Sequence, residues 1–454
     1  MEMELDAPLD SKENNINSNN NNSFKNKLIL IIILSLIIIS AIIITVLIIL
    51  KKDTTENTPN KSEDDVNYGI GKIICLYNIE ELSLKTKILG EEYENEDKID
   101  ILYQKKIINF VKEIEFKNIG NQEITFIIKK DNLNMDNMFK NVSSLISVTI
   151  NSENNVNISS MISVFESCKN LLNISISGLD TSKVKSMKKL FYKSSLNNLN
   201  FENINTRNVI DMSYMFSSTL FTELNLTNYN TDNLEDISFM FCNCSKLKKL
   251  NLESFNTKKI SNMSNLFQNC ILSSINLLNF DTSQVKNMSS MFDGCRNLKL
   301  LDLSHFNTNE VMDMSSMFQG CSSLNNLNLE SFNTNKVINM KSMFERCTLL
   351  SNIKFSESFN TKNAEDMSYF FSTCISLTSI DLSFINTKNM IDISYMFYLC
   401  SKLNSLNLSN FNINKIKYMS FLFYSCNNLI NLDISNLNTT QVEKMDYILQ
   451  IVIN

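Results

Sequence analysis

The chain has 454 residues, which is enough for two or three ordinary domains or for one long repeat array. It contains a single histidine, His305, which excludes a metal site with two histidine ligands. A Ser-His-Asp triad would have to use this one residue. We therefore expect no enzyme and no cofactor. The net charge is −6 and no basic face is evident, which argues against a nucleic acid as partner, because such binding requires basic side chains that displace counterions.

Residues 1–27 form a polar, asparagine-rich tail that we expect to be disordered. Asparagine accounts for 70 of the 454 residues, so its presence in a motif carries little weight. Residues 28–50, "LILIIILSLIIISAIIITVLIIL", are 23 consecutive residues without a charge. At 1.5 Å per residue they suit the roughly 30 Å core of a bilayer, and they predict a transmembrane helix that acts as an uncleaved signal anchor.

The lysines on the two sides of residues 28–50 are equal in number, so the positive-inside rule does not decide the orientation. We expect the common single-pass arrangement, with the tail inside and residues 51–454 outside the plasma membrane. Residues 51–70 are polar and are interpreted as a linker. Residues 71–133 carry short, β-branched and partly alternating apolar segments, which predict a small β-rich capping domain.

Residues 134–454 repeat a single pattern. A marker aromatic recurs at steps of 25 to 27 residues: Phe139, Phe165, Phe191, Phe216, Phe241, Phe267, Phe292, Phe318, Phe344, Phe371, Phe397 and Phe423. Self-similarity at a fixed period of this length indicates a solenoid, here of about twelve units.

One unit reads "FNTNEVMDMSSMFQGCSSLNNLNLES" from Phe306. Its apolar residues follow one another at steps of 3, 3, 1 and 3, which predicts a helix of two to three turns: Val311, Met314, Met317, Phe318 and Cys321. Asn307 or Thr308 stands where a helix N-cap is expected. Residues 324–329 then follow L-x-x-L-x-L, whose final alternation predicts a short strand. We therefore predict an α/β solenoid of helix-strand units with one parallel sheet.

The pattern F-N-T-x-x-V-x-x-M-S-x-M-F-x-x-C-x-x-L-x-x-L-x-L-S resembles the BspA-like leucine-rich repeats of surface proteins, a class that includes the mycoplasma lipoprotein-type repeats of 26 residues. The resemblance covers about residues 134–449. It implies a right-handed leucine-rich-repeat array, display at the cell surface, and adhesion to or binding of other proteins. The chain shows no lipoprotein cysteine near its start and no wall-sorting signal at its end, so we expect anchoring by the transmembrane helix instead.

Cysteines recur three residues after the marker aromatic, and the register stacks them in one column: Cys168, Cys244, Cys270, Cys295, Cys321, Cys347, Cys374, Cys400 and Cys426. Val142, Ser194 and Thr219 stand at this position in other units, which favours a ladder of buried structural thiols over metal ligands. Disulfides between neighbouring turns are the alternative, because the expected spacing of turns is close to the 4.4–6.8 Å that a disulfide allows between Cα atoms.

The middle residue of each L-x-L segment points away from the predicted core. These residues form a candidate partner-binding column on the concave surface: Asn251, Asn276, Asp302, Asn328, Lys354, Asp381, Asn407 and Asp433. The alternative is an ordinary solvated strand face. The column contains no aromatic anchor of the kind that binding hot spots favour, so we expect weak or multivalent contacts.

Together these features predict a membrane-anchored, non-catalytic surface protein whose repeat array binds proteins or surface glycoconjugates. The alternative hypothesis is a membrane-tethered scaffold that turns the same solenoid toward the cytosol. Both hypotheses place the chain in the membrane through residues 28–50, and neither involves a metal or a nucleic acid.

Overall fold

The computed structural model describes residues 69–82, 84–197, 204–408, 411, 414–432 and 439–449. They belong to one compact unit, residues 61–454. The expected tail, the expected transmembrane helix and nearly all of the expected linker lie outside the described residues. The strands are β1 (Gly71–Ile79), β2 (Thr86–Lys87), β3 (Ile99–Tyr103), β4 (Lys106–Ile108), β5 (Glu113–Ile114), β6 (Gly120–Ile128), β7 (Leu133–Asn134), β8 (Leu145–Asn151), β9 (Val156–Ser160), β10 (Asn173–Ile176), β11 (Leu179–Asp180), β12 (Glu223–Asn225), β13 (Lys249–Asn251), β14 (Asn326–Leu329), β15 (Asn352–Phe355), β16 (Ser405–Leu406) and β17 (Asn431–Leu432).

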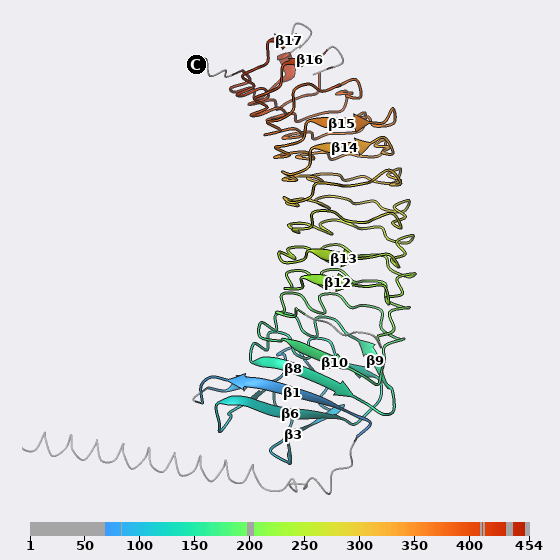
Figure 1. Cartoon of the computed structure of the whole chain (residues 1–454), viewed down its shortest axis with the longest axis vertical. Helices are drawn as coiled ribbons and strands as arrows, with labels where there is room; N and C mark the ends of the chain where they lie inside the picture. The colour runs from blue at the N-terminus through green and yellow to red at the C-terminus, as the bar shows by residue number, and fades with distance from the viewer. Residues whose placement is uncertain are drawn as a thin grey trace, which may run out of the picture. The chain divides into compact units, whose positions relative to one another are not determined.

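A six-stranded sheet closes the first turn of the array. β1 forms because its apolar residues alternate, so that Ile73, Cys75, Tyr77 and Ile79 are buried on one face. β1 pairs antiparallel with β6 on one side and with β8 on the other, and β10 joins β8 in parallel. The order is β10-β8-β1-β6-β3-β4 (Figure 1). Because β8 and β10 follow residue 133, the expected cap and the first turns share one sheet and one core.

The units of the array consist of turns, and the helix that we predicted in each unit is wrong. No α-helix occurs in the part of the chain that the structure describes, and residues 315–320 form consecutive turns. Ser316 and Gly320 have φ values of 55° and 68°, in the left-handed region. A right-handed helix cannot hold such residues four apart, so the predicted α/β solenoid is corrected to a β-solenoid.

Backbone hydrogen bonds join neighbouring turns instead of running along a helix. In the unit from Phe306, every second N–H group donates to a carbonyl of the next turn at 2.7–3.1 Å: Met314 to Asn339, Ser316 to Lys341, Phe318 to Met343 and Gly320 to Glu345. The N–H groups between them close turns to the carbonyl three residues back: Met317 to Met314, Gln319 to Ser316 and Cys321 to Phe318. These backbone groups are therefore paired without a helix.

The single parallel sheet that we predicted is replaced by a three-stranded parallel sheet, β11-β9-β7, and by separate pairs of strands. β12 pairs with β13, β14 with β15 and β16 with β17, each pair in parallel between neighbouring turns. A longer ladder of single parallel bridges runs five residues before the marker aromatic, through Ser186, Asp211, Asp236, Asn262, Asn287, Asp313, Asn339, Asp366, Asp392, Tyr418 and Lys444. Figure 1 shows the resulting stack of turns between β10 and β17.

A ladder of buried threonines joins the turns at the "FNT" segment. The Thr308 hydroxyl donates to the carbonyl of Asn333 and accepts the N–H of the same residue, both at 2.8 Å. The same pair of bonds to the backbone of an asparagine in the next turn is made by Thr282, Thr334 and Thr361. The threonine therefore links two turns, and our interpretation of Asn307 or Thr308 as a helix N-cap is wrong.

The core is a stack of identical side chains. Neighbouring marker phenylalanines from Phe139 to Phe423 have ring centroids 5.4–5.9 Å apart and interplanar angles of at most 22°. Such stacked pairs stabilise a core by about 0.5–1.5 kcal/mol each beyond the burial of their area. Met314, Met317 and Cys321 are fully buried beside them. One continuous apolar cluster runs from the cap to Cys426.

The prediction of a single-pass membrane protein is not supported by the structure and is corrected. A helix needs about 20 residues to cross a bilayer. In the described ranges no helix is long and apolar enough to do so, and the helical element there is the three-residue 3₁₀ segment η2 (Thr439–Gln441). The segment on which we based the localisation, residues 28–50, lies outside those ranges.

The threonine ladder gives a test of the fold. Thr308→Val leaves the part-buried N–H and carbonyl of Asn333 without their partner, so we expect the free energy of unfolding to fall by about 2–3 kcal/mol. Thr308→Ser keeps the hydroxyl and loses one methyl group, which costs about 1 kcal/mol. Urea unfolding followed by circular dichroism measures both variants. Equal losses would contradict a role for the hydroxyl.

Candidate functional site

The predicted polar column lies on a surface that we call the strand face, formed by the middle residues of the L-x-L segments. Its exposed members are Asn276, Asp302, Asn328, Lys354, Asp381 and Asn407. Asn251 is half-buried, and Asp433 lies outside the described residues. Strand pairing places Asn328 directly beside Lys354. The described part of the column thus faces solvent, and its binding of a partner stays a prediction.

The asparagines and aspartates of the column have a local structural role. In five of them the side-chain Oδ1 accepts the N–H of the residue two positions later, at 2.9–3.2 Å: Asn251, Asn276, Asp302, Asn328 and Asp381. The hydrogen bond from Ser304 lowers the pKa of Asp302 from its ordinary value. These bonds close turns at the end of the strand segment, which explains why poor strand formers recur there.

The strand face also holds an aromatic cluster that our sequence analysis missed. Phe355 and Phe384 are half-buried, and their ring centroids are 4.4 Å apart; Phe359 completes the cluster at 4.6 and 5.1 Å from them. Phe355 and Phe384 line a hollow of about 450 Å³ together with Asp381 of the polar column. The signal was present in the sequence, because Phe355 and Phe384 stand where the unit from Phe306 has Leu329 and Ser331.

A second aromatic surface lies on what we call the turn face, the exposed side of residues 315–320 and their equivalents. We call it the aromatic ribbon: Tyr369, Tyr395, Tyr398, Phe421, Tyr424 and Tyr447. Tyr369, Tyr395, Phe421 and Tyr447 stack in sequence, with centroids 4.5, 4.7 and 5.1 Å apart. Tyr398 stacks on Tyr424 at 5.2 Å. The rings are half-exposed, and Tyr447 is 62% exposed.

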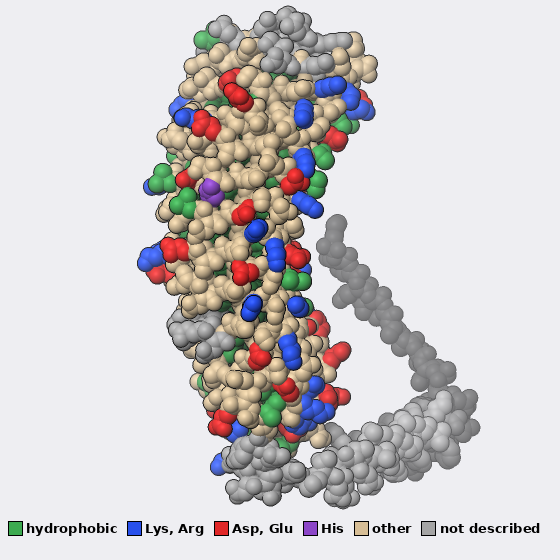
Figure 2. Space-filling view, turned by 90° about the vertical axis from the view of Figure 1, so that its right-hand side faces the viewer, with side chains coloured by type: hydrophobic (Ala, Val, Ile, Leu, Met, Phe, Trp, Pro, Cys, Tyr) green, Lys and Arg blue, Asp and Glu red, His purple; other side chains and the backbone are tan. Residues whose placement is uncertain are grey.

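Charged side chains of both signs are interspersed along the array (Figure 2). Several form exposed ion pairs between neighbouring turns: Lys249 with Glu223, Lys336 with Glu310 and Lys417 with Glu443, at 2.6–2.8 Å. Exposed pairs of this kind stabilise a fold by about 0–1 kcal/mol each. They hold neighbouring turns in register and create no surface of a single sign on the face that Figure 2 shows.

The cysteine column is a ladder of free, buried thiols. Each ladder Sγ donates to the carbonyl of a marker phenylalanine in the preceding turn at 3.0–3.2 Å, as Cys321 does to Phe292. All eleven cysteines are free. No group of three or more His, Cys, Asp or Glu side chains in the described ranges is placed to hold a metal ion. The thiols therefore act as small core residues that satisfy a buried carbonyl.

Burial makes these thiols poor nucleophiles. It raises the pKa of Cys244, Cys295 and Cys347 to about 12. Cys242 lies outside the column; its Sγ donates to Oε1 of Gln268 at 3.3 Å, and burial raises its pKa to about 11. A thiol with a pKa this high is protonated at neutral pH, and the thiolate is the reactive form.

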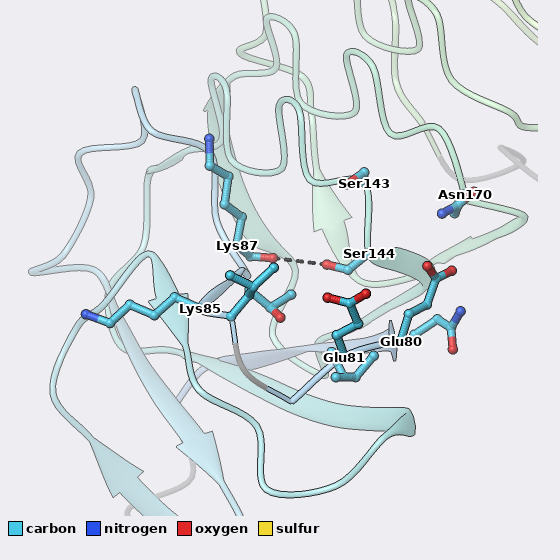
Figure 3. A pocket seen from close by; sticks show the side chains of 11 residues that line it. Glu80, Glu81, Lys85, Lys87, Ser143, Ser144 and Asn170 are labelled. Atoms are coloured by element: carbon cyan, nitrogen blue, oxygen red, sulfur yellow. Dashed lines mark hydrogen bonds between the residues drawn. The ribbon is translucent and has the colours of Figure 1, made fainter. Parts of the chain in front are cut away.

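A small pocket of about 360 Å³ lies at the edge of the cap (Figure 3). Glu80, Glu81, Lys85 and Lys87 line it together with Ser144, whose hydroxyl donates to the carbonyl of Lys87 at 3.1 Å. Its lining contains no histidine or cysteine, and the Ser144 hydroxyl is bonded to a backbone carbonyl rather than to a side-chain base.

His305 does not form part of a catalytic triad. Both of its ring nitrogens are buried without a hydrogen-bond partner, and its ring packs edge-on against Phe306 at 5.1 Å. A triad histidine instead bonds a nucleophile through one nitrogen and a carboxylate through the other.

Comparison with known proteins identifies a family whose sequence model matches most of the repeat array. The family model described as "Mycoplasma protein of unknown function, DUF285" matches residues 133–251, 240–355 and 349–453. No curated protein matches the chain.

Solved structures of repeat proteins resemble the chain. A leucine rich cell surface protein of Faecalibacterium prausnitzii is 16% identical over 69% of this chain and 85% of that one, with a TM-score of 0.35. A leucine-rich repeat protein of Bacteroides ovatus is 17% identical over 74% and 93%, with a TM-score of 0.38. The functional domain of InlJ from Listeria monocytogenes, which includes a cysteine ladder, is 14% identical over 66% and 62%, with a TM-score of 0.18.

The thiol ladder predicts a loss of stability in alkali. Thiols of the unfolded chain ionise near pH 8.5–9, whereas the folded ladder thiols, with pKa values raised by burial, stay protonated. Stability should be insensitive to these groups below about pH 8.5 and fall above it by up to about 1.4 kcal/mol per pH unit for each buried thiol. Urea unfolding at pH 7 to 10.5 measures the slope. Cys321→Val should reduce it, and a flat profile would contradict the ladder.

Proposed function

Since the chain belongs to the family described as "Mycoplasma protein of unknown function, DUF285", we propose that it is a non-catalytic scaffold that binds other proteins in interaction or adhesion. The family match confirms the resemblance of its 26-residue pattern to the BspA-like and mycoplasma-type repeats. Solenoids of this kind present long surfaces on which contacts from successive turns add together.

The observation that carries the proposal is the aromatic ribbon. Tyrosine and phenylalanine are enriched at protein interfaces because they bury much apolar area, and tyrosine adds a hydroxyl that can bond a partner. In the ribbon, Tyr395 stacks between Tyr369 and Phe421. Rings that are already held by their neighbours lose little conformational entropy when a partner covers them.

A protein partner fits this surface better than a small molecule does. The ribbon extends over four successive turns, from Tyr369 to Tyr447, along the edge of the stack. Small ligands are held in concave pockets that enclose most of their surface, whereas protein interfaces are broad and centre on aromatic anchors. The ribbon supplies the anchors, and the charged residues of neighbouring turns supply a polar rim.

The strand face is a second contact surface in this proposal. Asn276, Asp302, Asn328, Lys354 and Asp381 are exposed, and the hollow beside Phe355 and Phe384 adds aromatic area next to Asp381. One oxygen of each turn-closing side chain is already bonded to the backbone. Asn276, Asp302 and Asp381 therefore offer a partner their remaining amide or carboxylate atoms, whereas the Asn328 amide already donates to Glu330 at 3.1 Å. Contacts there are weaker than at the ribbon and gain by repetition along the array.

The proposal is tested with the full chain and a panel of immobilised, purified matrix proteins. We expect saturable binding to at least one of them. The double variant Tyr395→Asn/Phe421→Asn removes two ribbon rings and should weaken that binding about 30-fold, since two anchors of at least 1 kcal/mol each are lost. Asparagine suits this position, because Asn265 occupies it in another turn with φ 56°, close to the 59° and 58° of the replaced residues.

The matched control is Asn276→Asp/Asn328→Asp. It keeps the side-chain oxygens that close the turns and adds two negative charges to the strand face. A change confined to the ribbon variant places the partner on the turn face, and a change confined to the control places it on the strand face. The absence of saturable binding, or binding that neither variant alters, would overturn the proposal.

A further inference from the structure

A notch interrupts one column of side chains on the turn face. The residue two positions after each marker aromatic has a positive φ. In two of these turns it carries a large exposed side chain, Asn269 with φ 56° and Arg346 with φ 60°. Between them in the column stand Gly294 and Gly320, with φ 69° and 68°. Two successive turns therefore lack a side chain, and a hollow of about 580 Å³ lies there.

The fold does not require both glycines. Non-glycine residues hold the same left-handed conformation in this column, including the β-branched Thr373 with φ 61°. A Cβ added to Gly320 would meet no atom closer than 3.5 Å, which is ordinary contact. A Cβ on Gly294 would lie 2.0 Å from Oδ1 of Asn269, because the Asn269 side chain lies across that position. The empty space at Gly320 is thus a feature that packing leaves unexplained.

The composition of the chain singles out the same place. Only three of its 42 basic residues are arginines, Arg207, Arg296 and Arg346, and the last two line this hollow. Gly294 and Gly320 are also the only glycines after Gly178. Arginine presents five N–H donors in a planar fork that lysine lacks. In a chain that otherwise uses lysine, two arginines beside two glycines point to directed hydrogen bonding.

The hollow offers acceptors as well as donors. Nε2 of Gln268 donates to Asp293 at 2.7 Å, and Nε2 of Gln319 donates to Glu345 at 2.8 Å, which fixes both carboxylates. Nδ2 of Asn269 donates to Asn243 at 2.9 Å, so the Asn269 oxygen is directed over Gly294.

The donors belong to two exposed arginines. Arg346 is 69% exposed and contacts Glu345 with Nε at 3.4 Å, and Arg296 is exposed. Asp293 lies in the lining and Glu345 lies just outside it, beside Arg346, so the two carboxylates together offset the two guanidinium charges in and around the hollow.

We propose that this glycine notch, formed by Asn269, Asp293, Gly294, Arg296, Gly320 and Arg346, is a binding site for a neutral carbohydrate of one or two sugar residues. An anionic ligand supplies only acceptors and would face the Asp293 carboxylate, and a cation supplies only donors and would face the two arginines. A sugar hydroxyl is donor and acceptor at once, so neighbouring hydroxyls can bond a guanidinium and a carboxylate together. The volume lies within the range of small-ligand sites.

The site does not depend on the aromatic ribbon or the strand face. The test is isothermal calorimetry of the full chain with lactose, maltose, cellobiose and chitobiose, and with sialylated and sulfated lactose. We expect at least one neutral disaccharide to bind more tightly than the anionic sugars. Gly320→Asn places in the notch the residue that the column carries at position 269, and should weaken binding at least tenfold. Arg296→Lys keeps the charge, loses the fork and should weaken binding severalfold.

Tyr395→Asn/Phe421→Asn is the control, and it should leave sugar binding unchanged whatever it does to protein binding. Circular dichroism and the urea midpoint establish that Gly320→Asn is folded. If no neutral disaccharide binds, if only the anionic sugars bind, or if folded Gly320→Asn binds as tightly as the parent chain, the carbohydrate site is overturned.

Discussion

The backbone hydrogen bonds that join each turn to the next constrain every other part of the array. Because alternate N–H groups from Met314 to Gly320 bond the following turn, equivalent residues lie directly above one another. Each column must therefore contain side chains that pack on copies of themselves. Phenylalanine stacks on phenylalanine, a cysteine thiol bonds the carbonyl of the phenylalanine in the preceding turn, and a threonine hydroxyl bonds both backbone groups of one asparagine. The sequence repeats because these vertical contacts repeat.

The period, the core and the family were predictable from the sequence, and the secondary structure within a unit was not. Val311, Met314, Met317 and Cys321 are separated by three or four residues, as on one face of a helix. Successive turns give a similar spacing, because each is closed by a bond from residue i+3 to residue i, as from Met317 to Met314 and from Cys321 to Phe318. The two structures differ in the left-handed residues Ser316 and Gly320. A serine in a sequence does not indicate a left-handed conformation. The apolar pattern alone therefore could not distinguish a helix from a series of turns.

The same ambiguity affected the candidate sites. Asn328 and its column repeat for a reason that a single unit already contains, since each oxygen closes a turn two residues later. We chose that column because its side chains were expected to be exposed, and the structure shows that most of them are. We did not consider that the same side chains close turns. The aromatic ribbon was missed because Tyr395 and Phe421 replace Ser316 of the unit that we studied, and a substitution there looked like ordinary variation. Comparing one column across all units, rather than one unit along its length, would have revealed both the ribbon and the notch.

The vertical bonds of the threonine ladder reach only the adjacent turn. An internal turn that was duplicated or deleted as a whole would therefore find the same partners above and below, and the array could change length without a new core. Such a change would not be neutral for every surface. Copying the turn that contains Gly320 would widen the notch by one spacing of about 4.8 Å, and removing it would close the notch to a single turn. Exchange of whole repeats is thus a route by which the width of the notch changes while the interior of the array stays the same.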